Sequence, residues 1–321
     1  MCDESLAVLM GIGDLIGATD IAGGSPEQGR LTMAESQLMI EDDACPDVHV
    51  QDLVLEQGGA RVPARKYVPR GLSKPSPGIV YYHGGGFVLG DLDTHDRHCQ
   101  HLARDASARV IAVDYRLAPE NPFPAAVDDA TLAFRCVARR ANDFDMDPTR
   151  LAVMGDSAGG NLAAVVARKT RNDTQRPALQ VLVYPAVDGS CAMKSHKTFG
   201  QGWLLTTESM EWFYHHYVGD DPAARRQVDV SPLFADDFGG LPPALVYTAG
   251  FDPLRDEGMA YAERLEKSGI TVRQHCFGSL THGFAAMGGL CAAAREAAQH
   301  ISRDVGRALR EGLSARTENA A

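Results

Sequence analysis

The sequence has no block of basic residues and no apolar run long enough to cross a bilayer. Its 321 residues carry 31 Lys and Arg against 42 Asp and Glu, a net charge of −11. A phosphate backbone would be repelled on balance, so we expect no nucleic-acid partner. The apolar stretch at residues 6–16 follows two acidic residues and is interrupted by Gly and Asp. We therefore expect an amphipathic helix docked within the protein, with neither a signal peptide nor stable membrane insertion.

Cysteine motifs are also absent, because the seven cysteines are scattered and no two are spaced as C-x-x-C. An odd, dispersed set argues against a disulfide framework or a zinc ribbon, so we expect reduced thiols in a cytoplasmic protein. No H-E-x-x-H motif occurs, and the adjacent His215 and His216 would not share a helix face. The sequence thus predicts no metal site.

What is present is typical of a large globular α/β protein, with 45% hydrophobic and 23% charged residues. Apolar runs, which suit strands buried on both faces, occur at residues 78–82, 110–113, 151–154, 179–184 and 244–247. Helical patterns lie between or after them, at about 95–107, 124–140, 157–171, 256–268 and 290–309. This alternation predicts a doubly wound sheet, and a hairpin signal at Gly58-Gly59 predicts a mixed N-terminal edge.

About 60 residues separate Tyr184 from Ala244, far more than the usual connection of about 2–6 residues. Within this insertion we expect a helix capped by Thr207 and a cap over one end of the sheet. Its apolar side chains, and the Met and aromatic residues within residues 1–45, are interpreted either as ordinary packing or as the lining of a substrate pocket; those of the insertion include Trp203, Leu204, Leu205, Met210 and Phe213.

Residues 155–159 read Gly-Asp-Ser-Ala-Gly and lie between an apolar strand and an apolar helix. In that setting G-x-S-x-G predicts a nucleophile elbow, a strained turn that exposes the hydroxyl of Ser157. The glycines allow neighbouring backbone to approach without a Cβ clash. A turn that only links strand to helix is the alternative.

A second motif, residues 83–87, reads His-Gly-Gly-Gly-Phe and follows another apolar strand. Consecutive glycines can direct several N–H groups at one point, as an oxyanion hole requires. A phosphate loop would need a Gly-Lys-Ser or Gly-Lys-Thr ending, which is missing, and a plain tight turn is the remaining alternative.

A nucleophilic serine needs a base and an orienting carboxylate, and in this topology both follow the serine along the chain. Asp252 and His282 each follow a predicted strand, so both should lie at the sheet edge where such folds bind ligands. Asp256 is a rival acid but begins a helix, and His275 lies within a strand. Residues 114–120 form a charged loop in which we expect Arg116 to pair with a carboxylate.

Taken in this order and spacing, the motifs resemble those of hormone-sensitive-lipase-type bacterial esterases (family IV) of the α/β-hydrolase superfamily. The resemblance extends from about residue 47 to the closing helix. It implies an α/β-hydrolase fold, with an eight-stranded, mostly parallel sheet flanked by helices and a helical cap. The implied catalytic core covers residues 46–189 and 232–315, with cap helices in residues 1–45 and 190–231.

Carried over by position, the resemblance implies Ser157 as nucleophile, His282 as base and Asp252 as its partner. The implied oxyanion hole takes its backbone N–H groups from Gly85, Gly86 and Ala158. The same motif supplies His83 and Gly84, the N–H of Gly84 being a further candidate donor, and Phe87 is a candidate for the pocket.

The resemblance also implies an activity. A serine carboxylesterase would hydrolyse short- to medium-chain acyl esters through an acyl-serine intermediate. It would use a small-molecule ester substrate and no cofactor, and a homodimer could form through a sheet edge. The same motifs would equally serve a lactonase, an amidase or a deacetylase. A small-molecule receptor without chemistry is a further alternative, although it would not need His282 and Asp252.

Overall fold

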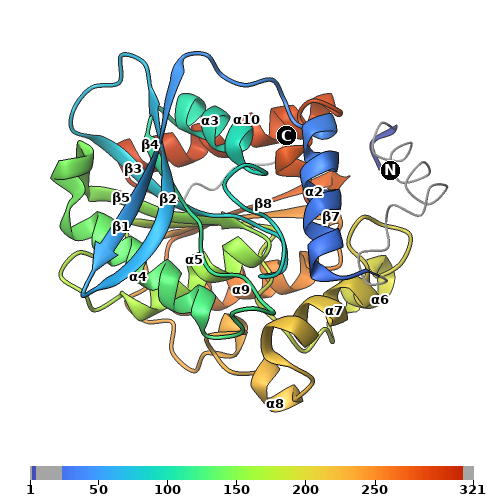
Figure 1. Ribbon diagram of the computed structural model, residues 1–321. Coiled ribbons are helices and arrows are strands. Elements are labelled where there is room, and N and C mark those ends of the chain that lie inside the picture. The colour runs from blue at the N-terminus through green and yellow to red at the C-terminus, as the bar shows by residue number, and fades with distance from the viewer. Residues whose placement is uncertain (1, 5–23, 314–321) are drawn as a thin grey trace.

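The computed structural model describes residues 2–4 and 24–313, and an eight-stranded sheet forms its centre (Figure 1). Across the sheet the order is β1-β2-β4-β3-β5-β6-β7-β8. The strands are β1 (Val48–Gln57), β2 (Ala60–Pro69), β3 (Ser76–Tyr82), β4 (Arg109–Val113), β5 (Met146–Asp156), β6 (Leu179–Val183), β7 (Ala244–Phe251) and β8 (Val272–Thr281). β2 pairs antiparallel with β1 and β4, and all other pairs are parallel. The predicted fold class, with its mixed N-terminal edge, is confirmed.

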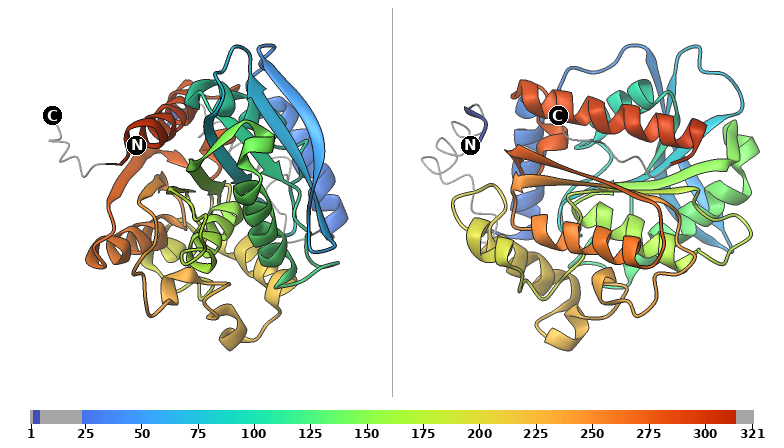
Figure 2. Two further views of the ribbon diagram at one scale, coloured as in Figure 1. Left: turned by 90° about the vertical axis from the view of Figure 1, so that its left-hand side faces the viewer. Right: turned by 180° about the vertical axis from the view of Figure 1, so that it is seen from behind.

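Helices cover both faces of the sheet, as the continuous apolar strands require. α3 (Asp96–Ala106) and α10 (Ala292–Glu311) lie on one face, and α4 (Ala125–Arg139), α5 (Ala158–Lys169) and α9 (Arg255–Lys267) lie on the other (Figures 1 and 2). Successive residues of β3 alternate between the two resulting cores: Ile79 packs with α3 and α10, and Val80 packs with α4 and α5.

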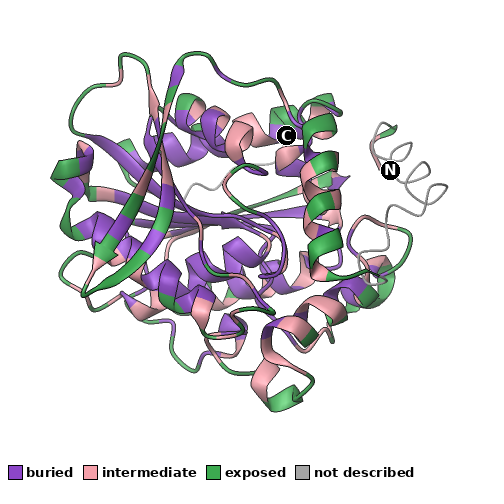
Figure 3. Cartoon of the chain, in the orientation of Figure 1, coloured by how far each residue is buried: buried purple, intermediate pink, exposed green. Residues whose placement is uncertain are grey.

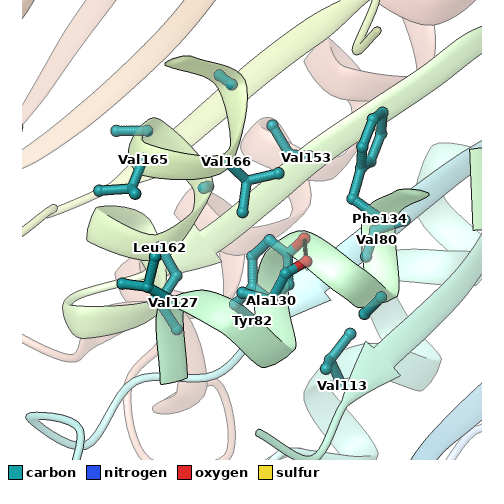
Figure 4. Packing of buried hydrophobic residues seen from close by; sticks show 14 of the residues in the cluster. Val80, Tyr82, Val113, Val127, Ala130, Phe134, Val153, Leu162, Val165 and Val166 are labelled. Carbon is teal, nitrogen blue, oxygen red and sulfur yellow. Dashed lines mark hydrogen bonds between the residues drawn. The ribbon is translucent and has the colours of Figure 1, made fainter. Parts of the chain in front are cut away.

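The core beneath α4 and α5 is closely packed (Figure 4). Phe134 and Leu162 are fully buried there against Val80 and Val153 of the sheet. Tyr82 is also buried, and its hydroxyl donates to the carbonyl of Ala130 at 2.9 Å, so that no polar group is left unpaired at that point. This core fixes the position of α5 and therefore of the turn that precedes it.

Four further α-helices of the described residues are α2 (Pro26–Ile40), α6 (Lys194–Phe199), α7 (Thr207–Val218) and α8 (Pro222–Arg225); α2, α6 and α7 lie near one end of the sheet, and α8 continues from α7 away from it (Figure 1). The inserted helix that the sequence predicts is α7, but Thr206, not Thr207, is its N-cap and accepts a hydrogen bond from the N–H of Ser209. The side chain of Ser25 caps α2, with Pro26 at its first position.

α2 is attached to the core by Arg30. Its guanidinium donates to both carboxylate oxygens of Glu120, at 2.8 and 2.7 Å, and to the carbonyls of Val88 and Ala118. The pairing lowers the pKa of Glu120 to about 2. The outer side of α2 is exposed (Figure 3), with Leu31 60% accessible. One prediction, the helix at residues 6–16, lies outside the described residues.

No helix in the described part of the chain combines the length and the apolar composition needed to cross a bilayer.

Candidate active site

Ser157 occupies the turn between β5 and α5, with φ of 54° and ψ of −119°. This strained conformation depends on glycine neighbours. A Cβ on Gly159 would overlap the carbonyl of Tyr82, and a Cβ on Gly155 would overlap the carbonyl of Gly159. The Ser157 N–H donates to the carbonyl of Val183 at 2.9 Å, which ties the turn to the adjacent strand β6. The local sequence therefore produces the elbow geometry that its motif predicts.

Asp252 and His282 converge on Ser157 from the ends of β7 and β8. His282 Nε2 lies 3.0 Å from Ser157 Oγ, and His282 Nδ1 lies 2.9 Å from Asp252 Oδ2. Asp252 is fully buried, and its other oxygen accepts the N–H of Leu254 at 2.8 Å. With the carboxylate on Nδ1–H, Nε2 is left as the acceptor that faces the hydroxyl. This is the arrangement in which an imidazole can remove the proton of a serine.

The two rival residues named from the sequence lie elsewhere. Asp256 Oδ2 accepts the N–H of Ser195 at 2.9 Å, and its Oδ1 pairs with Arg255. His275 is exposed on strand β8. The predicted pairing of Arg116 is confirmed, since its guanidinium binds both oxygens of Asp129 at 2.7 and 2.8 Å.

The triple-glycine loop passes beside Ser157. Gly85 and Gly86 have φ of 112° and 62°, a backbone region that favours glycine. Among the described residues, no protein atom accepts a hydrogen bond from the N–H of Gly85 or of Gly86. Ala158 is the first residue of α5, so its N–H lacks an intrahelical acceptor. These free donors are the groups that could bind a developing oxyanion.

The N–H of Gly84, the further candidate donor, already has a hydrogen-bond acceptor within the protein. Its N–H donates to Asp156 Oδ1 at 2.9 Å, and the same oxygen accepts the hydroxyl of Tyr81 at 2.6 Å. The carboxylate therefore holds the start of the loop, and the Gly84 N–H is unavailable to a ligand. The sequence motif alone could not separate this N–H from its neighbours.

His83 stabilises the start of the triple-glycine loop through buried contacts. It is buried and stacked on Tyr115, whose hydroxyl donates to the His83 carbonyl at 2.8 Å. Burial, with the nearby His95, lowers the pKa of His83 to about 4, so the ring is neutral at pH 7. Its Nδ1–H can then donate to the carbonyl of Gly84, 2.7 Å away.

A cavity of about 300 Å³ opens beside Ser157 and His282. The predicted pocket residues Phe87, Leu204, Leu205 and Phe213 contribute to its wall. The ring of Phe213 lies so close to Gly86 that a Cβ there would overlap it. Trp203 was predicted with them, but it is not in the lining and instead stacks on Phe251 at 4.6 Å between ring centroids.

Sequence reasoning missed much of this wall. α2 supplies Gly29, Thr32 and Ser36 beside Met33, and the rest of the unpredicted lining includes Asp156, Tyr214, Leu254 and Met287. The signal in α2 is the i, i+3, i+4, i+7 spacing of these four residues, but three of the four are small or polar, and such side chains do not suggest a pocket. Within the described ranges, no three His, Cys, Asp or Glu side chains lie close enough to hold a metal ion together.

Comparison with known proteins places these features in context. The family described as alpha/beta hydrolase fold matches residues 79–286. The carboxylic ester hydrolase LipN of Mycobacterium tuberculosis is 48% identical over 74% of this chain and 65% of its own, so the chain spans less than two thirds of that relative. The ethyl acetate hydrolase of Pseudomonas putida is 40% identical over 84% of this chain and 86% of its own.

A solved structure is similar to this chain in both fold and sequence. The ester-hydrolase EH1AB1 from the metagenome of Lake Arreo, in complex with a bipyridine phosphonate derivative, superposes with a TM-score of 0.90. It shares 38% sequence identity, and the superposition covers 95% of this chain and 98% of that one.

The packing of the elbow generates a stability prediction. Gly159→Ala should lower the free energy of unfolding by about 1–3 kcal/mol, because the new methyl group would overlap the Tyr82 carbonyl. Urea denaturation measures the change. Gly278→Ala is the matched control, since nothing lies within 4 Å of a Cβ there. Equal stability of the two variants would show that the elbow is not closely packed.

Proposed function

This chain belongs to the hormone-sensitive-lipase-type branch of the alpha/beta hydrolase fold family, and from that membership we propose that it is a serine carboxylesterase acting on small esters. The observation that carries the proposal is the hydrogen-bonded series from Asp252 through His282 to Ser157 at the wall of a cavity. The relatives named carboxylic ester hydrolase and ethyl acetate hydrolase support the reaction class.

In the proposed reaction Ser157 attacks the ester carbonyl while His282 Nε2 takes its proton. Asp252 stabilises the imidazolium from the other side of the ring. When the tetrahedral intermediate collapses, the ester C–O bond breaks and His282 donates its proton to the oxygen of the leaving alcohol. An acyl-serine remains. Water, deprotonated by the same imidazole, then attacks the acyl carbon. His282 returns that proton to Ser157 Oγ as the bond between this oxygen and the acyl carbon breaks, and the acid is released.

The oxyanion of the tetrahedral intermediate would be bound by the N–H groups of Gly85, Gly86 and Ala158. Removal of one such donor typically costs about 3 kcal/mol, or 10²–10³ in rate. The Ala158 N–H also lies at the N-terminus of α5, where the helix dipole favours negative charge. The start of the loop is held by Asp156, so the donors are oriented before the substrate arrives.

The cavity supports substrates of limited size. Its volume of about 300 Å³ is at the lower end of the range of roughly 300–1,000 Å³ for ligand sites. The side chains from α2 and α7 are mainly apolar or small. Short- to medium-chain acyl esters fit this description better than long-chain lipids.

The first prediction concerns the nucleophile. A fluorophosphonate probe should label the wild-type protein at one position, which peptide mass spectrometry should identify as Ser157. Ser157→Ala should abolish both labelling and hydrolysis of nitrophenyl butyrate. Ser190→Ala, which alters a partly buried hydroxyl outside the cavity, is the control. Labelling that survives in Ser157→Ala would exclude Ser157 as the nucleophile, and an unlabelled wild type would favour a receptor.

The second prediction concerns the acyl group. Across the nitrophenyl acetate, butyrate, hexanoate, octanoate and laurate series, kcat/KM should be highest at the short or middle members. Phe213→Ala should move the optimum to longer chains because the ring forms part of the cavity wall. Leu31→Ala, at an exposed position of α2, should leave it in place. A wild-type maximum at laurate would contradict the proposed size limit, and a faster rate on a lactone or an anilide would change the bond assignment.

We also propose that a second copy pairs along β8. This strand is the last in the order of the sheet, and Gln274 and Cys276 are exposed along it, ahead of Ser279, whose carbonyl accepts the N–H of Asp3. The edge strand of a sheet is a template for another strand. Sedimentation velocity should therefore show a dimer that forms as the concentration rises, and a monomer at every concentration would contradict the pairing.

The location that we propose is the cytoplasm. All seven cysteines are free thiols, and a reducing compartment would keep them so. Fractionation of cells of the native host should recover the protein in the cytoplasmic fraction. Recovery in another fraction would contradict the proposal.

A further inference from the structure

Glu257 is a fully buried carboxylate that the proposed reaction does not use. It lies in the first turn of α9, five residues after Asp252. Its Oε1 accepts the N–H groups of Val187 at 2.6 Å and Asp188 at 3.1 Å, and its Oε2 lies 2.6 Å from His196 Nε2. One side chain thus joins α9 to the segment after β6 and to the short helix α6.

The His196 contact has a defined direction. The N–H of Met193 donates to His196 Nδ1 at 2.9 Å, so this nitrogen carries the lone pair. The proton of the neutral ring is then on Nε2 and is donated to Glu257. His196 is 1% exposed, and the pair therefore connects the first helix of the insertion to the catalytic core without access to water.

The segment held by Glu257 also holds the nucleophile. Ala186 precedes Val187, and its N–H donates to the carbonyl of Ser157 at 3.1 Å. The Ala186 carbonyl accepts the side-chain amide of Asn161 at 2.6 Å. A displacement of residues 186–188 would therefore move the backbone of Ser157.

A second set of contacts from α6 reaches the loop of the acid. Ser195 Oγ donates to the carbonyl of Pro253 at 2.6 Å and accepts the N–H of Asp256 at 3.2 Å. Pro253 directly follows Asp252, whose Oδ1 is bound by the N–H of Leu254. Ser195 thus joins the two ends of the turn that follows Asp252, and Glu257, the residue after this turn, binds the segment that holds Ser157.

Burial makes the ionised form of the Glu257 carboxylate unfavourable. It raises the pKa of Glu257 to about 7, which reflects the penalty for a charge without water. A well-packed apolar side chain is often at least as stable at such a position, so stability alone is weak grounds for the pair. The carboxylate instead supplies acceptors for three donors that belong to two other segments.

We propose that Glu257, together with Ser195 and His196, forms a positioning junction that holds Ser157 and Asp252 at the separation His282 bridges. The inference rests on the proposed function, since its readout is ester hydrolysis. It assigns to α6 a role in the reaction geometry in addition to covering the sheet end.

The test measures kcat and KM of Glu257→Ala and Glu257→Gln on nitrophenyl butyrate. Glu257→Ala should lower kcat by about 10²-fold, as expected for a displacement of about 1 Å in reacting groups, with KM near the wild-type value. Glu257→Gln keeps an acceptor for Val187 but turns a donor towards His196, so its loss should be smaller. Glu263→Gln, exposed on the same helix, is the matched control and should retain wild-type values.

Each outcome decides the inference. A fall in kcat at constant KM, in variants whose circular dichroism is native, supports it. Unchanged kinetics, or a rise in KM at constant kcat, would overturn it, because Glu257 would then be structural or would only shape the cavity. Should both Glu257 variants fail to fold, Ser195→Ala decides: a lower kcat at constant KM supports the junction, and wild-type kinetics overturn it. Failure of the proposed function is distinguished by a wild-type protein that hydrolyses no ester.

Discussion

The hydrogen bond between His282 Nε2 and Ser157 Oγ is the interaction on which the rest of the account depends. The two residues are 125 positions apart and are brought to 3.0 Å by the geometry of the sheet. β5, β7 and β8 run parallel, so their carboxyl ends lie at one edge, and each catalytic candidate immediately follows one of these ends. The core beneath α5 and the Gly155–Gly159 contact hold the elbow, so the nucleophile is presented by rigid elements.

The rest of the site supports the same geometry from different directions. Asp156 and His83 hold the start of the triple-glycine loop, which leaves the N–H groups of Gly85 and Gly86 free. Helix α7 supplies an apolar wall of the cavity through Phe213, and the junction around Glu257 ties the inserted helix α6 to the segments that carry Ser157 and Asp252. The insertion therefore contacts the sheet core at the segments of the catalytic candidates as well as at the cavity.

Much of this could be predicted from the sequence because the relevant signals are local. Continuous apolar runs specify strands covered on both faces, and Gly-Asp-Ser-Ala-Gly between a strand and a helix specifies a turn with few alternatives. Asp252 and His282 could be named because the parallel order predicts which loops share an edge. The convergence of these residues could be predicted without knowledge of side-chain packing.

The errors and omissions share a different cause. Trp203 and Leu204 are adjacent and both apolar, yet only Leu204 lines the cavity, since the path of an irregular loop decides which side chain turns inward. The N–H of Gly84 is taken by Asp156, a contact between segments 72 residues apart. Glu257 follows the acid loop as an ordinary helix-start carboxylate, and only the fold reveals that it is buried against His196. Long-range polar contacts of this kind have no periodic signal.

The most direct test of the central claim is whether Ser157 and His282 act as one unit. This is measured by comparing kcat for Ser157→Ala, His282→Ala and the double variant on one nitrophenyl ester. If the imidazole works only through the serine hydroxyl, the double variant should be no slower than the slower single variant. Losses that multiply in the double variant would show that the two side chains contribute independently, and would contradict the account.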